Sequence, residues 1–284
     1  MPLARQPLPA RPAPAPAVAD FQARDVAFGL DPKRAADWSS DEFRSLFFNS
    51  LSITFPVGER FFIDSVAHYR KRITDPKLRA EVNAFVAQEA LHTREHIAYN
   101  VALETLADVA KHERRIDAVF ELIKKRLSPR VALAATCALE HFTAIMARDV
   151  LEYAPHLRGA DERYARLWTW HALEECEHKA VSFDVYQSVT GGKRNFARIV
   201  TMAAATLILY TFLAMISFDL MKGRGLEKSP VAWAKLLWAV FGRHGLMRRI
   251  VPAYAKYYSP AFHPNDIDDA TTRERTKRLV ASWA

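Results

Sequence analysis

Two pentapeptides decide the fold of this chain: QEALH at residues 88–92 and EECEH at residues 174–178. Each contains a Glu that is followed by a His three positions later, and side chains at that spacing lie on one face of a helix. Carboxylate and imidazole groups are ligands for transition metals, so each pentapeptide can direct two ligands to one metal centre. The two stretches therefore predict two helices that share a metal site.

The sequence around the pentapeptides supports helices and gives few signals for strands. Of 284 residues only 9 are Gly and 50% are hydrophobic, and short alternating runs of Val, Ile and Thr between turn residues are scarce. Capping residues followed by Pro or by an acidic residue mark helix starts. We expect four long helices: one that follows Ser40 and Pro56 and ends near Ile73, one from Asp75-Pro76, one from Ser128-Pro129 to the residues before Pro155, and one from Asp161 to Gly191-Gly192. A charged stretch at about 111–126 predicts a shorter helix between the second and the third.

The other two long helices each supply one further Glu, so the ligand order is Glu, Glu-x-x-His, Glu, Glu-x-x-His. Within each predicted hairpin the two Glu residues lie at nearly equal distances from the turn, which places them at the same height. Ferritin-like di-metal proteins are built from this set. We therefore predict an all-α protein, with a ferritin-like four-helix bundle at 40–192 and additional C-terminal helices. The predicted metal ligands are Glu59, Glu89, His92, Glu140, Glu175 and His178.

Burial of four glutamates is costly unless their charge is compensated. Two divalent cations would balance the four negative charges, and carboxylate-rich ligands with some nitrogen suit iron. We expect two iron ions, with manganese or zinc as alternatives. The competing interpretation is that these glutamates are solvated residues on amphipathic helices, accompanied by two incidental histidines.

Further histidines lie close to the predicted ligands. His171 precedes Glu175 by four positions and shares its helix face, so we include it as a seventh ligand; the alternative is a core histidine beside Trp168. This His-x-x-x-Glu-x-x-His pattern resembles the last ligand helix of the non-haem di-iron arylamine N-oxygenases. We expect His96 to be a partner of a ligand or a pocket base, and His141 to point away from the site.

A second metal pattern overlaps the first pentapeptide. The sequence HTREH at residues 92–96 matches the His-x-x-Glu-His pattern of the inverted zinc proteases, in which two histidines bind zinc beside a general base. This alternative leaves Glu59, Glu140, Glu175 and His178 without a role.

The run 55–186, which contains all of these motifs, resembles a family of bacterial proteins labelled predicted metal-dependent hydrolases. The segment Pro260–Asp266 (PAFHPND) is similar to a motif of the same family, although its residues suggest no chemical role. The resemblance covers nearly all of the chain after the Pro-rich residues 1–20, which we interpret as a disordered tail without a secretory signal. It implies a ferritin-like metal site and does not fix the reaction.

The C-terminal region 193–284 is rich in apolar and aromatic residues. Ile199–Phe218 contains no charge and is about as long as the ~20 residues that cross a bilayer. Trp, Tyr and basic residues follow it, a combination that suits a lipid headgroup surface. We favour a region that packs on the bundle and associates with a membrane surface, while a helix of the protein core remains the alternative. The net charge of +8 comes without a nucleic-acid recognition motif, so no nucleic acid is expected.

These features together favour an enzyme that acts on an apolar or lipid-like small molecule. The first hypothesis is an O2-activating di-iron oxidase or oxygenase, which would need an electron-donor protein. The alternative is a hydrolase with a di-metal-activated water. Two cysteines are too few for a disulfide framework, which suits a reducing compartment. We expect a cytoplasmic protein, associated with the inner membrane if the apolar region contacts lipid. The sequence does not reveal the oligomeric state.

Overall fold

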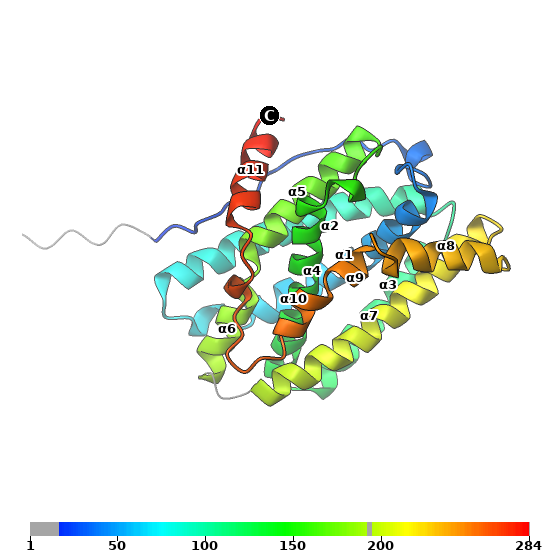
Figure 1. Cartoon of the computed structure of the whole chain (residues 1–284). Coiled ribbons are helices and arrows are strands. Elements are labelled where there is room, and N and C mark those ends of the chain that lie inside the picture. Colours follow the sequence, from blue (N-terminus) through cyan, green and yellow to red (C-terminus); the bar gives the residue numbers. More distant parts are fainter. Residues whose placement is uncertain (1–16, 192–194, 284) are drawn as a thin grey trace, which may run out of the picture.

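The computed structural model describes residues 17–191 and 195–283, and within these ranges the chain is helical and contains no strand (Figure 1). The all-α prediction is thereby confirmed. Residues 1–16 of the predicted tail and Gly192 lie outside the described residues. In chain order the helices are α1 (Glu42–Ala67), α2 (Pro76–Leu103), α3 (Val109–Arg126), α4 (Pro129–Glu152), α5 (Glu162–His178), α6 (Val181–Thr190), α7 (Asn195–Gly223), α8 (Pro230–Phe241), α9 (Leu246–Arg249), α10 (Val251–Lys256) and α11 (Ala270–Ala281), with short 3-10 turns at Pro32–Arg34, Arg70–Arg72, Ala154–His156 and Pro264–Asp266.

Four helices carry the predicted ligands and pack around them. Helix α1 packs against α2 and α4, and α5 packs against α4 and α2, so the four form a bundle with a shared interior. Helix α3, which the charged stretch predicted, packs mainly on α1. Residues 17–31 run as an extended segment along the bundle before α1 begins, and this segment is blue in Figure 1.

The predicted helix starts are mostly confirmed, with one shift. Asp75 and Asp161 cap α2 and α5 by accepting hydrogen bonds from backbone N–H groups in the first turn. The cap of α1 is Asp41 rather than Ser40, since the Asp41 carboxylate accepts from the N–H groups of Phe43 and Arg44. The Ser40 hydroxyl donates instead to the carbonyl of Arg158.

Helix α1 corrects the prediction around Pro56, because it runs through this proline and ends at Ala67 instead of Ile73. A proline inside a helix lacks the N–H that would bond to the carbonyl four residues earlier. That carbonyl belongs to Ser52, and the side-chain amide of Asn100 on α2 donates to it at 3.0 Å. A side chain of the neighbouring helix therefore replaces the missing bond.

The predicted fourth helix is interrupted at Lys179 and Ala180, which separate α5 from α6. The Lys179 ammonium is buried and donates to the carbonyl of Ile267 at 2.7 Å and to the Asp269 carboxylate at 2.6 Å. A buried charge requires such partners. The interruption thus lies where the C-terminal segment contacts the bundle, directly after the ligand helix α5.

Helix α7 contains the uncharged stretch and packs on α4 and α1. Among the described residues, two helices are long and apolar enough to cross a bilayer. They are Pro129–Glu152, whose most apolar stretch is 78% buried, and Phe196–Gly223, whose most apolar stretch is 33% buried. The first is a core helix of the bundle. The second buries one face and exposes the other, on which Phe196 and Leu207 are 81% and 72% exposed.

Candidate metal centre

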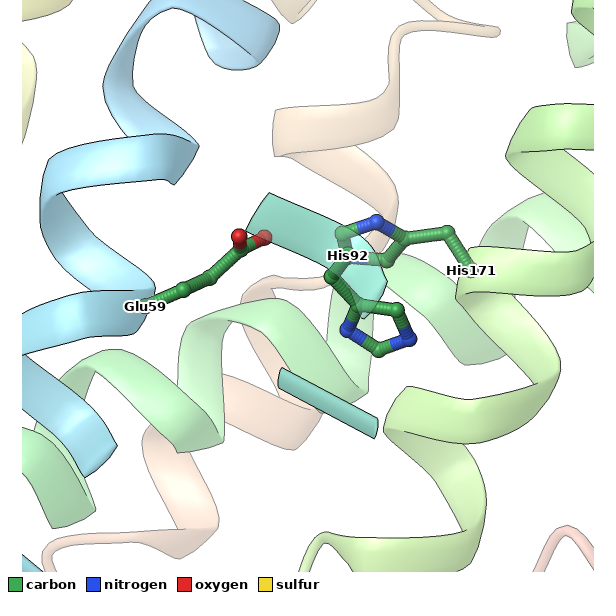
Figure 2. Close-up of side chains that lie close together, drawn as sticks. All are labelled: Glu59, His92 and His171. Carbon is green, nitrogen blue, oxygen red and sulfur yellow. The ribbon is translucent and has the colours of Figure 1, made fainter. Parts of the chain in front are cut away.

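The structure brings the seven predicted ligands together between α1, α2, α4 and α5. All seven side chains are buried, with at most 3% of the surface of each exposed. Their potential ligand atoms form three overlapping groups. Within each group, one ligand atom from each residue lies within 4.8 Å of the others. The groups are Glu59, His92 and His171; Glu89, His92 and Glu175; and Glu89, Glu140 and His178. Figure 2 shows the first group, in which the side chains come from three helices and point toward one another.

Many inward-facing atoms of this cluster have no hydrogen-bond partner among the described residues. They are Oε1 of Glu59, both carboxylate oxygens of Glu89 and Glu140, Oε2 of Glu175, Nδ1 of His92 and Nε2 of His178. A buried polar atom without a partner costs about 1–3 kcal/mol. Such a concentration of unpaired oxygen and nitrogen atoms at one point fits a site for metal ions, because an ion would satisfy all of them.

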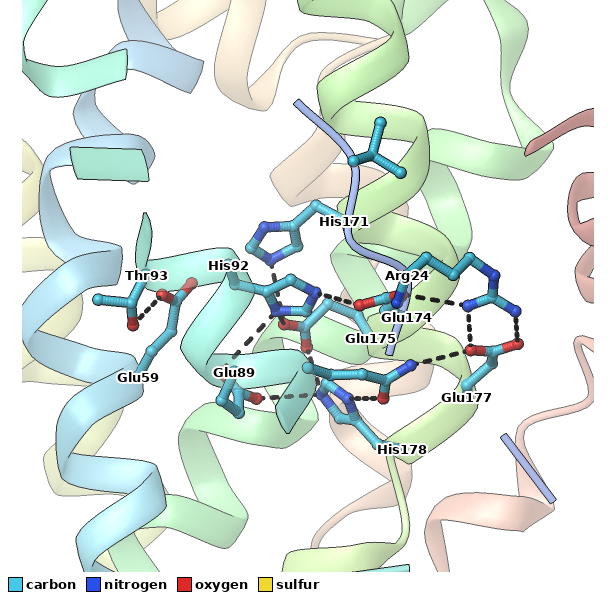
Figure 3. A network of polar contacts seen from close by, with 12 residues as sticks. Arg24, Glu59, Glu89, His92, Thr93, His171, Glu174, Glu175, Glu177 and His178 are labelled. Atoms are coloured by element: carbon cyan, nitrogen blue, oxygen red, sulfur yellow. Dashed lines mark hydrogen bonds and ion pairs between the residues drawn. The ribbon is translucent and has the colours of Figure 1, made fainter. Parts of the chain in front are cut away.

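His92 and His178 are held in the orientation that metal ligands require. Nε2 of His92 lies 3.1 Å from the Glu174 carboxylate, and Nδ1 of His178 lies 2.9 Å from the Gln88 carbonyl oxygen (Figure 3). Because both partners are acceptors, these outer nitrogens carry the hydrogens and donate. The inner nitrogens then present lone pairs to the carboxylates. Metal-binding histidines commonly have this arrangement.

His171 is oriented by a longer chain of hydrogen bonds. The Ser52 hydroxyl donates to Oδ1 of Asn100 at 2.7 Å, so it accepts from Nδ1 of His96 at 2.9 Å. Nε2 of His96 must then accept from Nδ1 of His171 at 2.8 Å. This leaves a lone pair on Nε2 of His171, which lies 3.0 Å from the Glu175 carboxylate. Two acceptors face each other there unless a proton or a cation lies between or beside them.

Glu89 and Glu175 each face two histidines. One oxygen of Glu89 lies 3.9 Å from Nδ1 of His92 and the other 3.2 Å from Nε2 of His178. The oxygens of Glu175 lie 3.7 Å and 3.5 Å from the same two nitrogens. Glu59 and Glu140 do not face both His92 and His178, since Glu59 belongs to a group with His92 only and Glu140 to a group with His178 only. Glu89 and Glu175 thus each lie between His92 and His178, an arrangement that the sequence could not decide.

The ionisation of the cluster reflects burial first and neighbouring charges second. Burial raises the pKa values of Glu59, Glu89 and Glu140 well above the ordinary value, and nearby carboxylates raise them further. Burial lowers the pKa of His92 well below its ordinary value, with His171 adding to the effect.

Glu175 and His178 behave differently, because their mutual attraction outweighs burial. The pKa of Glu175 lies well below its ordinary value, and the pKa of His178 is raised to about 9. Without an ion the cluster thus holds protons where cations would lie, and metal binding would release them.

A comparison with protein-family models follows this geometry. The model of a family described as predicted metal-dependent hydrolase matches residues 22–268. The chain belongs to this family. No match was found among curated proteins or among solved structures. Membership of this family of predicted metal-dependent hydrolases agrees with the buried Glu and His groups that could hold a metal ion.

The region matched by the hydrolase family includes a polar network that the sequence analysis missed. Arg24, on the extended N-terminal segment, donates to both oxygens of Glu177 at 2.7 Å and to Glu174 (Figure 3). Gln88 donates to Glu177 at 3.0 Å. Arg24 therefore belongs to the same hydrogen-bond network as Glu174 and Gln88, which are the partners of His92 and His178. In the sequence, Gln88, Glu174 and Glu177 are direct neighbours of the predicted ligands, and this proximity could have indicated their involvement. No such signal marks Arg24, which is separated from Glu174 by 150 positions.

The remaining predictions about histidines can also be compared with the structure. His96 uses both ring nitrogens, toward Ser52 and toward the predicted ligand His171, and it belongs to none of the three groups of potential ligands. This geometry argues against the inverted zinc protease pattern. His141 points away from the cluster, with Nε2 3.3 Å from the carbonyl of Ala253, and burial lowers its pKa to about 4.

The C-terminal motif of the hydrolase family is a packing element in this structure. Phe262 is buried, and its ring contacts those of His141 and Phe183. Nε2 of His263 donates to the Asp184 carboxylate at 2.9 Å, which joins the motif to α6. The motif thus fixes the C-terminal segment to the bundle near the Lys179 interruption.

Proposed function

We propose that this protein is a hydrolase whose centre holds two divalent metal ions between α1, α2, α4 and α5. The observation that supports it most is the group of unpaired inward atoms on six buried residues, together with membership of the metal-dependent hydrolase family. Two ions at about 3.5–4 Å from each other activate water and polarise the bond that is cleaved.

The ligand groups suggest which residues would hold each ion. One ion would be held by Glu59, His92 and His171, and the other by Glu140 and His178. Glu89 and Glu175 would contact both. The Thr93 hydroxyl donates to Oε2 of Glu59 at 2.9 Å, which fixes that carboxylate and leaves its second oxygen for an ion.

The protein's own groups would orient the reactants and exclude bulk water. In hydrolysis the water oxygen bonds to the electrophilic atom of the substrate, and the leaving group departs with one of the water protons. Glu174, Gln88 and His96 keep the three histidines in one tautomer, so that their inner nitrogens stay free for the ions. The aromatic ring of Phe55, stacked on His171 with ring centroids 4.8 Å apart, shields one side of the cluster.

A second candidate function is an O2-activating di-iron oxidase with a separate electron-donor protein. It is favoured by one specific observation: a third histidine, His171, lies in a group with Glu59 and His92. A nitrogen at that position would occupy a place that a reacting water needs, and four carboxylates with three imidazoles suit iron. The hydrolase proposal takes precedence because the family description supports it.

Metal analysis and two activity assays on one preparation would test these functions. We expect about two metal ions per chain after anaerobic loading with Fe2+, Mn2+ or Zn2+. The loaded protein should cleave at least one of a panel of 4-nitrophenyl esters and phosphates without O2, and Glu140→Gln should abolish cleavage while Glu152→Gln leaves it unchanged. O2 uptake by the Fe2+ form with no cleavage by any metal form would favour the oxidase instead.

A further inference from the structure

An apolar cavity lies beside the candidate centre, between α1, α3, α4 and α7. Its volume is about 210 Å3, and none of its lining residues is charged. Three threonines line it, yet the hydroxyls of Thr54, Thr143 and Thr201 donate to backbone carbonyls of their own helices. Their methyl groups therefore face the cavity, and the wall offers no strong hydrogen-bonding group to a ligand.

The cavity is elongated along the helices. On α1 its lining extends from Leu51 to Phe62, and on α7 from Thr201 to Phe212. Each of these stretches covers roughly 16 Å at ~1.5 Å per residue. A long narrow space without polar partners suits an aliphatic chain, whereas a peptide or a sugar would lose its hydrogen bonds there.

One side of the cavity borders the ligands. Phe55 and Phe62 lie four positions before and three after Glu59, on the same face of α1, and both line the cavity. A second hollow, of about 30 Å3, is lined by His171 and Glu175 and shares Phe55, Thr143 and two further residues with the large one. The two spaces thus adjoin at these four shared side chains, and the smaller one borders the candidate centre.

The opposite side reaches the protein surface. Leu127, directly after α3, lines the cavity and is 48% exposed, and Ala204 on α7 is also both lining and exposed. Leu207, one turn further along α7, is 72% exposed. A chain-like molecule could therefore enter between α3 and α7, where apolar side chains reach the surface.

We propose that this cavity binds the aliphatic chain of the substrate and directs its reactive group to the hollow beside His171 and Glu175. The inference rests on the proposed function for the chemistry at that hollow, but binding of the chain does not depend on it. The cavity is thereby assigned to the linear alkyl or acyl chain of a substrate, and aromatic or strongly polar groups are excluded from the cavity itself.

Calorimetric titration of the metal-free protein with linear alcohols tests the proposal directly. We expect 1-octanol to bind with one site per chain, and affinity to rise about fourfold per methylene from 1-butanol to 1-octanol, as expected for buried CH2 groups. 1,8-Octanediol should bind at least tenfold more weakly than 1-octanol. Tighter binding of benzyl alcohol than of 1-hexanol, or an affinity independent of chain length, would overturn the proposal.

Two matched substitutions locate the binding. Ala205 lines the cavity, whereas Ala203 on the same helix is exposed and does not line it. Ala205→Phe should weaken 1-octanol binding at least tenfold, and Ala203→Phe should leave it unchanged. Gly58→Leu is a second filling variant: a Cβ at Gly58 meets only ring carbon Cζ of Phe62 within 4 Å, at 3.8 Å, so the backbone tolerates it. Equal binding by wild type, Ala205→Phe and Gly58→Leu would contradict the assignment.

The same samples separate this proposal from the metal proposal. If wild type binds 1-octanol with the expected pattern but takes up no metal, the chemistry is wrong and the alkyl-chain site stands. If it takes up two metal ions but binds no alcohol, the cavity proposal alone fails. Circular dichroism and thermal unfolding of each variant confirm that it is folded before its binding is compared.

Discussion

Glu140 is the residue on which the four-helix ligand set depends most directly. It is fully buried on α4, and neither carboxylate oxygen has a hydrogen-bond partner within the described residues. Its role is therefore difficult to explain without a cation. We expect Glu140→Ala to lose at least one of two metal ions per chain by elemental analysis, because a buried ligand set loses both charge balance and geometry. Glu152→Ala, on the same helix but paired with Arg148 at the surface, is the control. Full metal content in Glu140→Ala would contradict the ligand set.

His171 provides a second prediction at this scale. Its hydrogen bond to His96 leaves Nε2 free toward the cluster, so we expect it to bind one ion and to make the two ions inequivalent. His171→Ala should retain most of the metal, since six ligands remain, but should change the optical spectrum of the cobalt-substituted protein. A spectrum identical to that of wild type would show that His171 is a packing residue. His96→Ala should produce a smaller spectral change, because it removes only the partner of the ligand.

Residue positions in the site were predictable where the signal is local. A Glu and a His three positions apart reveal a shared helix face, and this spacing identified Glu89, His92, Glu175 and His178. Nothing local marks Arg24, because it reaches Glu174 and Glu177 only after the N-terminal segment has folded along the bundle. The positions of Glu89 and Glu175 between His92 and His178 also depend on side-chain geometry across helices.

At the scale of elements, the contact between α1 and α2 contains a compensation that can be measured. Asn100 replaces the hydrogen bond that Pro56 removes from the carbonyl of Ser52. Asn100→Ala should lower the free energy of unfolding by about 1–3 kcal/mol, since it leaves a buried carbonyl without a donor. In a Pro56→Ala background the restored N–H can bond to Ser52, so the same substitution should cost about 1 kcal/mol less. Chemical denaturation of the four variants gives this coupling energy, and strictly additive costs would contradict the compensation.

The same proline shows why element boundaries are difficult to predict from the sequence. A proline normally interrupts a helix, but a side chain of α2 makes the position of Pro56 inside α1 tolerable. The predicted fourth helix was too long, because the helix is interrupted at Lys179. The Lys179 ammonium donates a hydrogen bond to Asp269, which lies 90 positions away in the sequence. Local sequence patterns contain neither contact.

The whole molecule should show a pH dependence that changes sign with metal content. In the metal-free protein the pKa of His178 is raised to about 9, and burial raises those of Glu59, Glu89 and Glu140 well above 4.5. Groups with raised pKa values hold protons in the folded state that the unfolded chain has released, so their stabilisation is lost as the pH rises. Groups with lowered pKa values have the opposite effect, because they make stability rise with pH. For His92 and His96 this rise ends at about their ordinary pKa of 6.5, and for Glu175 it ends at about 4.5.

The window from pH 6.5 to 9 therefore isolates the groups with raised pKa values. We expect the unfolding free energy of the metal-free protein to fall by up to about 1.4 kcal/mol per pH unit for each proton that the folded state holds and the unfolded chain has released. The metal-loaded protein should gain stability over the same range relative to the metal-free form, because the ligands must be deprotonated to bind. Denaturant midpoints at pH 6.5, 7.5 and 8.5 with and without metal provide the measurement. A metal-free protein whose stability rises over this range would contradict the assignment of these groups.

The surface of the molecule along α7 and α8 leads to the last prediction. Besides Phe196 and Leu207, this surface exposes Val231, Leu237 and Trp238 by 62%, 54% and 68%. The exposed basic residues Lys235, Arg243 and Arg248 lie on α8 and just after it. Exposed apolar side chains next to basic groups suit the headgroup region of an anionic bilayer. Because the inner face of α7 packs on α1 and α4, the helix would lie on such a surface rather than cross it.

We therefore expect the protein to co-sediment with vesicles that contain phosphatidylglycerol, and to do so less well with pure phosphatidylcholine and at high salt. The double variant Leu207→Glu, Trp238→Glu should abolish binding, since it places two charges where apolar groups would enter the headgroup layer. Val101→Glu is the matched control, because Val101 is an apolar residue of α2 that is 59% exposed outside this surface. Equal sedimentation of the double variant and wild type, or no binding of wild type at low salt, would show that the exposed face of α7 does not contact lipid. Such a result would leave the cavity beside the metal centre accessible to substrates from solution.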